Sequence, residues 1–132
     1  MTPQSVLLDT NVISYMYRDS PQATPFFDVM VSRRGLYSFQ TYAELRVWSA
    51  HWSGSKRAHL ERWLLGRFGF LARTPDVTEK WIEANLSAKK NGYPISGADA
   101  WIAATALSSG LMLLTADKND FLGVDGLKLL SV

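Results

Sequence analysis

Four acidic residues occupy positions that a parallel sheet would bring to one edge. Asp9 and Asp117 each follow a short apolar run of the kind that forms a buried strand. Glu44 and Asp99 each fall in the first turn of an expected helix. The carboxyl ends of parallel strands and the N-termini of the following helices lie on the same edge of a right-handed β-α-β sheet. We therefore expect the four carboxylates to share one rim, where open α/β sheets bind their ligands.

Such a rim predicts metal-dependent hydrolysis. Neighbouring carboxylates repel one another, and without compensation one of them would become protonated. A divalent cation offsets that cost, and Mg²⁺ is usually held by one or two carboxylates, several waters and a substrate phosphate. A water bound to such an ion is a better nucleophile, and the ion stabilises charge on a scissile phosphate. The predicted chemistry is therefore phosphodiester hydrolysis.

The composition narrows the choice of metal. The 132 residues include no cysteine and only two histidines, His51 and His59. The missing cysteines exclude disulfides, thiolate zinc sites and cysteine nucleophiles. We interpret the two histidines, which have no partner at a metal-ligand spacing, as partly exposed helix residues. Any metal must then be held by oxygen, which favours Mg²⁺ or Mn²⁺ over Zn²⁺.

Each acid also has a purely structural interpretation. Glu44 and Asp99 sit at the third position of apparent capping boxes, where a carboxylate is stabilising in any case. Asp9 could cap a following turn, and Asp117 and Asp120 could be ordinary turn acids. The convergence of four acids on one edge favours a site over four separate structural roles. Asp120 lies only three residues after Asp117, so either could be the fourth acid.

Three polar residues beside the acids could orient carboxylates or waters by hydrogen bonds. They are Thr10, Asn11 and Thr115. The alternative is that they only complete the turns at strand ends.

The elements that must position these residues alternate along the chain. Short apolar runs predict strands at residues 5–8, 36–39, 68–73, 111–115 and 127–132. Amphipathic or capped segments predict helices at residues 12–18, 20–34, 41–52, 56–65, 74–90 and 96–107. Continuously apolar strands between helices indicate a mainly parallel sheet covered on both faces. We expect one domain over residues 1–132, a three-layer α/β/α sandwich with a mainly parallel central sheet.

The charge is distributed unevenly. The formal net charge is only +2, but residues 33–73 hold eight basic and two acidic side chains. This basic middle predicts a polyanion-binding surface beside the carboxylates, although two solvated, arginine-rich helices would look the same. Trp48 and Trp52 could stack on bases there, or could belong to a helix interface. The candidate contacts to RNA are Arg46, Lys56, Arg57 and Arg62.

The chain lacks the features of a membrane or secreted protein. No run of about 18 apolar residues is present, so no membrane span is expected. The N-terminus has no basic segment followed by a long apolar core, so we expect no signal peptide and a cytoplasmic location.

At the residues discussed above, the sequence resembles the PIN-domain ribonucleases. It is most similar to the small, VapC-like toxins of VapBC-type toxin–antitoxin pairs. Four stretches carry the resemblance in the order of the family: residues 7–13, 42–45, 99–106 and 114–121. The C-terminal segment, in which Gly126 is followed by a final apolar stretch, is also similar to that of the family.

The resemblance implies a Rossmann-like α/β/α sandwich and an endoribonuclease that depends on Mg²⁺ or Mn²⁺. Asp9, Glu44 and Asp99 match the three acids that bind metal in the family, and Asp117 matches its fourth acid position. Thr10, Asn11 and Thr115 match polar positions that support the metal site. The resemblance further implies a homodimer, a small antitoxin that buries a segment in the active-site groove, and structured RNA substrates, often tRNA or rRNA.

Two alternatives to an RNase remain at this stage. The first is a non-catalytic PIN-like module that binds RNA or a protein partner. The intact acids at all four positions argue against it. The second is a phosphatase of the haloacid dehalogenase type that uses Asp9 as nucleophile. Asn11 stands where such an enzyme would have a second aspartate, which disfavours it.

Overall fold

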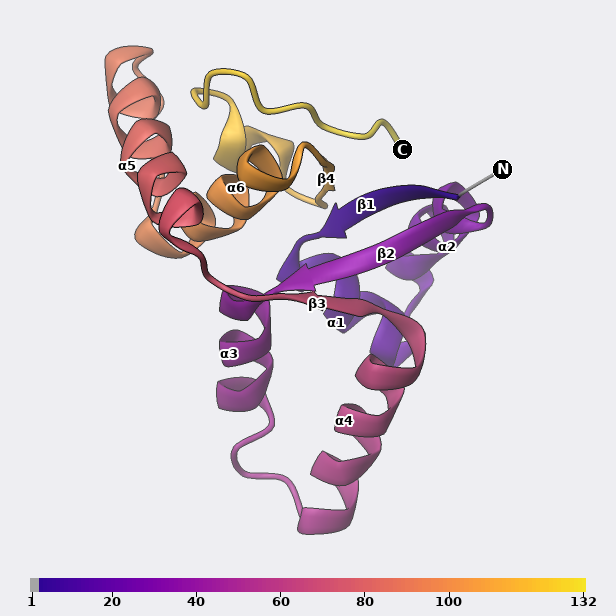
Figure 1. Cartoon of the computed structure of the whole chain (residues 1–132). Coiled ribbons are helices and arrows are strands. Elements are labelled where there is room, and N and C mark those ends of the chain that lie inside the picture. The colour runs from indigo at the N-terminus through magenta and orange to yellow at the C-terminus, as the bar shows by residue number, and fades with distance from the viewer. Residues whose placement is uncertain (1–2) are drawn as a thin grey trace.

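Four parallel strands form the centre of the molecule. Figure 1 shows the computed structural model, which describes residues 3–132. The sheet has the order β3-β2-β1-β4. Every pair is parallel, with Val6 opposite both Gly35 and Met112. The strands are β1 (Gln4–Leu8), β2 (Arg33–Ser38), β3 (Gly69–Leu71) and β4 (Met112–Leu114).

Helices cover both faces of this sheet. The α-helices are α1 (Thr10–Arg18), α2 (Thr24–Met30), α3 (Phe39–Trp48), α4 (Gly54–Arg67), α5 (Pro75–Lys90) and α6 (Gly97–Ser109). Two short 3-10 helices, η1 (Pro21–Ala23) and η2 (Lys118–Phe121), complete the chain. Helices α5 and α6 pack together on one face, whereas α3 and α4 extend away from the sheet as a helical arm (Figure 1).

The sequence of β1 explains the layered core. Successive side chains of a strand point to opposite faces. Val6 and Leu8 therefore join a core with α1, α2 and α4, while Leu7 joins a second core with α5 and α6. All three side chains are fully buried, which accounts for an uninterrupted apolar run. The predicted three-layer α/β/α sandwich is confirmed.

Helix 20–34 was predicted too long. Helix α2 ends at Met30 and β2 begins at Arg33. Gly35, which falls between the predicted helix 20–34 and the predicted strand 36–39, lies inside β2, where a Cβ atom would sit 2.6 Å from the Phe68 ring. That close packing is made between residues distant in sequence, so local propensity did not reveal it.

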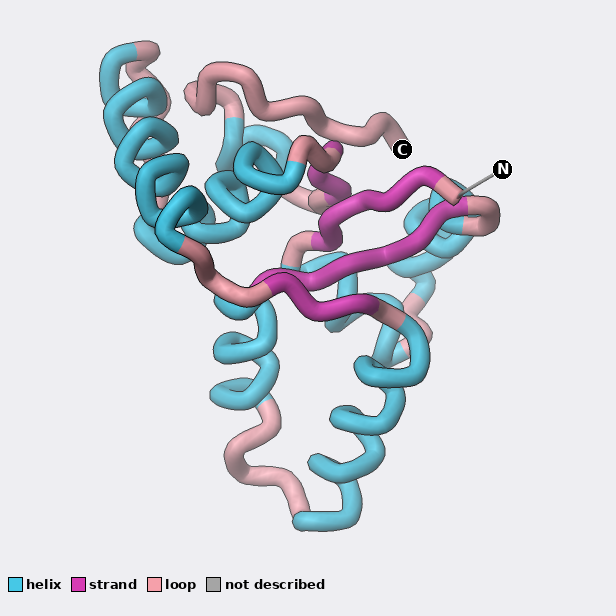
Figure 2. Tube along the Cα trace, in the orientation of Figure 1, coloured by secondary structure: helices cyan, strands magenta, loops and turns pink. Residues whose placement is uncertain are grey.

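Other boundaries also differ from the prediction, and α3, for example, ends at Trp48 rather than at residue 52. Helix α3 begins at Phe39 rather than at residue 41, because the side chain of Ser38 accepts the N–H of Thr41 and caps the helix. The final strand at 127–132 is absent from the described residues except for one bridge between Leu113 and Leu129. Figure 2 accordingly shows the segment after η2 as a loop.

Within the described part of the chain, no helix has both the length and the apolar character needed to cross a membrane.

Candidate active site

Asp9 joins β1 to α1 at the carboxyl edge of the sheet. Its backbone N–H donates to the carbonyl of Leu114 on β4, at 2.9 Å. One carboxylate oxygen, Oδ1, accepts the backbone N–H of Thr10 at 2.8 Å. The other, Oδ2, accepts the hydroxyl of Thr115 at 2.7 Å. Asp9 is only 6% exposed, so its carboxylate is fixed between two neighbouring strands.

This position perturbs the acidity of Asp9. Burial raises the pKa of its carboxyl from 3.8 to about 6. Hydrogen bonds from Thr115 and Thr10 oppose the shift, whereas the charges of Asp99 and Glu44 add to it. The three acids are therefore close enough to repel one another. A cation at this edge would relieve that repulsion.

Glu44 is held by a chain of three hydroxyl groups. The Thr10 hydroxyl donates to a carboxylate oxygen of Glu44 and lies 2.9 Å from the Thr41 hydroxyl. Because Thr10 gives its only hydroxyl proton to Glu44, Thr41 must be the donor to Thr10. Ser38 in turn donates to Thr41 at 3.5 Å. Ser38 and Thr41 are fully buried, so the chain connects the core to the rim.

Asp99 enters the site from the first turn of α6. Its backbone N–H donates to the Ser96 side chain at 3.1 Å, which caps the helix as the sequence predicts. Burial raises the pKa of Asp99, and the charges of Asp120, Glu44 and Asp117 raise it further, against a hydrogen bond to Ser96. Asp99 thus faces acids from two other segments of the chain, α3 and the start of η2.

Asp117 is tied to the same network through backbone and side-chain contacts. Its carboxylate accepts the side-chain amide of Asn11 at 3.1 Å, and its N–H donates to the Thr115 hydroxyl at 3.0 Å. Asp120 lies in η2 and is exposed. A hollow of about 560 Å³ opens beside both acids, lined also by Phe26. Of the two acids, Asp117 is the one hydrogen-bonded to residues that follow β1 and β4, namely Asn11 and Thr115.

All five predicted acids therefore approach one rim, with their three polar neighbours. Among residues 3–132, however, no group of three or more acidic or histidine side chains that could hold a metal ion is found. A divalent cation such as Mg²⁺ usually takes only one or two carboxylates and keeps several waters. The oxygen-only donors, and the repulsion of Asp9 by Asp99 and Glu44, fit a divalent cation held in that way.

The hydroxyl groups of Ser38 and Thr41 were not anticipated as part of the site. Thr41 was assigned to a helix cap, but it lies inside α3 and bonds to Thr10. The available signal was a second hydroxyl residue three positions earlier, at Ser38, which forms the actual cap. Glu44 is consequently past the first turn of α3, and the capping interpretation of this acid was wrong.

The four predicted RNA contacts lie on the α3–α4 arm rather than on the rim. Arg46 is engaged by the Tyr42 hydroxyl at 3.0 Å and by Glu61 at 3.8 Å. The Lys56 ammonium lies 4.3 Å from the centroid of the Trp52 ring. Arg57 and Arg62 are exposed on α4.

Aromatic residues hold the base of that arm together. Tyr17 of α1 packs against Trp52 at 6.0 Å and against Trp63 at 5.1 Å between ring centroids. Its hydroxyl lies 2.8 Å from Nδ1 of His59. This intramolecular packing supports the helix-interface interpretation of Trp52. His59 is an exposed helix residue as predicted, whereas His51 lies in the loop between α3 and α4.

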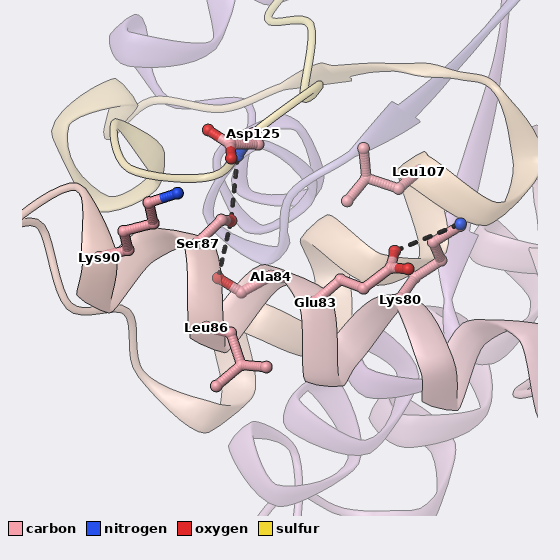
Figure 3. A pocket seen from close by; sticks show the side chains of 8 residues that line it. All are labelled: Lys80, Glu83, Ala84, Leu86, Ser87, Lys90, Leu107 and Asp125. Atoms are coloured by element: carbon pink, nitrogen blue, oxygen red, sulfur yellow. Dashed lines mark hydrogen bonds and ion pairs between the residues drawn. The ribbon is translucent and has the colours of Figure 1, made fainter.

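Another hollow, of about 600 Å³, lies against α5 (Figure 3). On α5, Lys80 pairs with Glu83 one turn away at 3.3 Å, and Ser87 accepts the N–H of Asp125 at 3.1 Å. None of the candidate acids lines this hollow, so it is not part of the rim.

Known proteins are similar to this chain both in sequence and in fold. The PIN domain family matches residues 6–127. Over 125 residues the chain is 36% identical to the plasmid stability protein StbB of Pseudomonas syringae pv. tomato, covering 88% of this chain and 90% of StbB. Ribonuclease VapC1 of Haemophilus influenzae is 32% identical over 120 residues, covering 87% and 88% of the two chains. The structure of VapBC-1 from nontypeable Haemophilus influenzae matches with a TM-score of 0.78 and 27% identity, covering 97% of this chain and 98% of that one.

Proposed function

Because the chain belongs to the PIN-domain family, we propose that it is a metal-dependent endoribonuclease. The observation that carries this proposal is the carboxylate rim. Burial and neighbouring acids raise the pKa of both Asp9 and Asp99, which favours a bound cation over two protons. The name of the relative ribonuclease VapC1 supports RNA as the substrate.

We assign the residues of the rim to two tasks. Asp9, Glu44 and Asp99 would hold Mg²⁺ or Mn²⁺, with Asp117 as the fourth acid. When bound, the ion would lower the pKa of a coordinated water and stabilise charge on the scissile phosphate. Thr10 and Thr115 fix the two oxygens of Asp9, and Asn11 orients Asp117. The expected outcome is hydrolysis that leaves a 5′-phosphate and a 3′-hydroxyl.

We also propose that the chain is the toxin of a toxin–antitoxin pair. Its likeness to VapBC-1 supports a small antitoxin partner that covers the rim. A homodimer and a tRNA or rRNA substrate belong to the same proposal, as does a cytoplasmic site of action. A short open reading frame next to this gene, with a DNA-binding N-terminus, would support the pairing.

The rim is tested by Asp9→Asn and Asp99→Asn, each of which keeps side-chain size and removes one charge. Both purified variants should stay folded by circular dichroism and lose Mg²⁺-dependent cleavage of total RNA. Mapping the ends of the wild-type products identifies the cut site. If both variants cleave like wild type, the assignment of these acids is wrong.

The same experiment addresses a non-catalytic module. That alternative is favoured by one observation, that no group of three or more acidic or histidine side chains that could hold a metal ion is found among residues 3–132. It predicts that the wild-type protein binds RNA but leaves it intact in Mg²⁺ and in Mn²⁺. Cleavage by wild type that EDTA abolishes would exclude it.

A further inference from the structure

The position of Glu44 depends on the direction of the helix that carries it. Asp9 follows β1 directly, Asp99 lies in the first turn of α6, and Asp117 comes three residues after β4. Glu44 is instead the sixth residue of α3, about 7.5 Å along the helix from Phe39. A tilt of α3 by about 10° about its first residue would move Glu44 by about 1.3 Å. Functional groups must be held to within about 0.5 Å, so Glu44 requires a helix that is firmly supported.

Two faces of α3 contact the rest of the protein. On the first face, Thr41 and Leu45 are buried. At about 100° per residue, Tyr42 and Arg46 share a second face, which is opposite to the face of Glu44. This second face is turned toward α4, because both of its side chains contact one residue of that helix.

That residue is Glu61. Its carboxylate accepts the Tyr42 hydroxyl at 3.1 and 3.4 Å and lies 3.8 Å from Nε of Arg46. Arg46 also donates to the Tyr42 hydroxyl oxygen at 3.0 Å, so the three side chains form one network. Helix α4 is itself anchored, because Leu60 and Leu64 are buried in the core. Glu61 therefore offers α3 a fixed point of attachment.

We propose that Glu61 is a positioning residue for metal binding, which holds α3 through the Tyr42 hydroxyl and so fixes the place of Glu44. The inference rests on the proposed function, in which Glu44 is a ligand of the cation. The ion pair with Arg46 is exposed and contributes little. The hydrogen bond from Tyr42 is charge-assisted and part-buried, so it is the contact that supports the helix. Glu44 is thus held from both sides, by the hydroxyl chain in front and by Glu61 behind.

This role accounts for the second acid of the basic middle. Among residues 33–73, the two acids are Glu44 and Glu61, against eight basic side chains. An acid on an arm that only bound RNA would weaken the attraction of that arm for phosphate. The contact with Tyr42 requires an acceptor at this point, which a carboxylate supplies. Arg46, which was predicted to contact RNA, belongs to the same support.

The test measures Mn²⁺ binding without RNA, from the loss of the electron paramagnetic resonance signal of free Mn²⁺. Tyr42→Phe keeps the ring against Phe70, at 6.1 Å between centroids, and removes the hydroxyl. Glu61→Leu removes the acceptor, whereas Glu61→Gln keeps an oxygen that can accept the same hydroxyl. Tyr93→Phe is the matched control, because Tyr93 is exposed in the loop between α5 and α6, outside this network. Each protein is measured well below its own melting temperature, so that unfolding does not contribute.

We expect Tyr42→Phe and Glu61→Leu each to weaken Mn²⁺ binding by about three- to tenfold, somewhat less than direct partners of metal ligands do. The double variant should bind no more weakly than either single variant, because both substitutions remove one contact. Glu61→Gln and Tyr93→Phe should bind Mn²⁺ like wild type.

Three results would overturn the positioning role. The first is an unchanged Mn²⁺ affinity in Tyr42→Phe, even if its melting temperature falls. The second is a loss in the double variant equal to the product of the single losses, which would show that Tyr42 and Glu61 act independently. The third is an equal loss in Glu61→Gln and Glu61→Leu, which would assign the effect to the charge of Glu61 rather than to its hydrogen bond.

Binding without RNA also separates this inference from the proposed activity. If wild type binds Mn²⁺ but cleaves no RNA, and Tyr42→Phe binds the ion more weakly, the nuclease proposal fails and the positioning role stands. If wild type cleaves RNA in Mn²⁺ and Tyr42→Phe binds the ion normally, the positioning role fails and the nuclease proposal stands. A wild-type protein that binds no Mn²⁺ would overturn both.

Discussion

At the scale of single residues, Asp9 meets two opposing demands. It must be rigid to place a carboxylate at the end of β1, and rigidity comes from burial that disfavours its charge. Hydrogen bonds from Thr10 and Thr115 stabilise the carboxylate and offset part of the free-energy cost of burying its charge. The part that they do not offset raises the pKa of Asp9 from 3.8 to about 6. The metal-free protein is therefore expected to be destabilised where Asp9 is ionised.

This gives a prediction about pH. The unfolded chain loses the Asp9 proton near pH 3.8, but the folded protein keeps it until about pH 6. The contribution of Asp9 to the stability of the metal-free protein is thus fully present below pH 3.8 and is lost as the pH rises through 6, by about 3 kcal/mol. Asp9→Asn should recover most of that loss at pH 8, measured by urea unfolding in EDTA. Its amide can still accept the Thr10 N–H and donate to Thr115. A variant less stable than wild type at pH 8 would contradict this.

The hydroxyl chain behind Glu44 gives a second prediction at this scale. Thr41→Val keeps the shape of the side chain and removes the hydroxyl that supports Thr10. It should lower kcat for RNA cleavage by about tenfold or more, because outer-shell partners of metal ligands have effects of that size. Thr41→Ser keeps the hydroxyl and loses a buried methyl group, which costs about 1 kcal/mol of stability.

The two Thr41 variants separate a positioning role from a structural one. If the hydroxyl orients Glu44, the serine variant melts earlier and cleaves normally, while the valine variant, which also melts earlier because the buried Ser38 hydroxyl loses its acceptor, cleaves poorly. If activity simply follows the melting temperature in both variants, Thr41 has no positioning role.

At the scale of elements, serine caps fix the residues at which the acid-bearing helices begin. Ser38 begins α3 and Ser96 begins α6, so the two helices that carry Glu44 and Asp99 both start at the rim. Ser53 caps α4 in the same way, by accepting the N–H of Lys56 at 3.2 Å, but on the arm. Equivalent local chemistry therefore begins a helix that carries a rim acid in two cases and a helix without one in the third.

The caps of α6 and α4 form a matched pair for mutation. Ser96→Ala and Ser53→Ala should each cost about 1 kcal/mol of stability, since each leaves one backbone N–H of the first turn without its acceptor. Only Ser96→Ala should also reduce cleavage several-fold, because the released N–H belongs to Asp99. Thermal melts and initial rates on the same RNA compare the two. Equal loss of activity in Ser53→Ala would show that stability alone accounts for the effect.

At the scale of the whole molecule, the domain separates its charges by the direction of its strands. Parallel strands place every carboxyl end at one edge and every amino end at the other. The acids that follow β1 and β4 consequently meet at the rim, and the arginines that begin β2 lie at the far edge. A net charge of only +2 conceals this separation. Binding of a cation at the rim would leave the molecule facing RNA with a more uniformly positive surface.

Cation binding should also be visible as global stabilisation. A ligand that binds only the folded state at about 100 times its Kd adds about 2.7 kcal/mol. We expect Mg²⁺ to raise the melting temperature of wild type at pH 8 by several degrees, beyond the effect of sodium chloride at matched ionic strength. Asp9→Asn and Asp99→Asn should lose most of that rise. The same rise in both variants would place the ion elsewhere.

The sequence by itself determined the chemistry and the class of fold. Without cysteine and with two isolated histidines, only oxygen ligands remained for a metal. The apolar runs that end in Asp9 and before Asp117 were sufficient to predict a parallel sheet with its acids at one edge. The fold class was predicted correctly because strand burial and strand-end polarity are local properties of the chain.

Tertiary structure decided what depended on contacts between distant residues. Parallel pairing of β2 with β1 placed Arg33 and Arg34 in a strand where the end of a helix was predicted, and the register of β1 with β4 brought Thr115 to Asp9. The hydroxyl chain to Glu44 arises in the same way. Packing across the sheet creates these contacts, and no local pattern in the sequence encodes them.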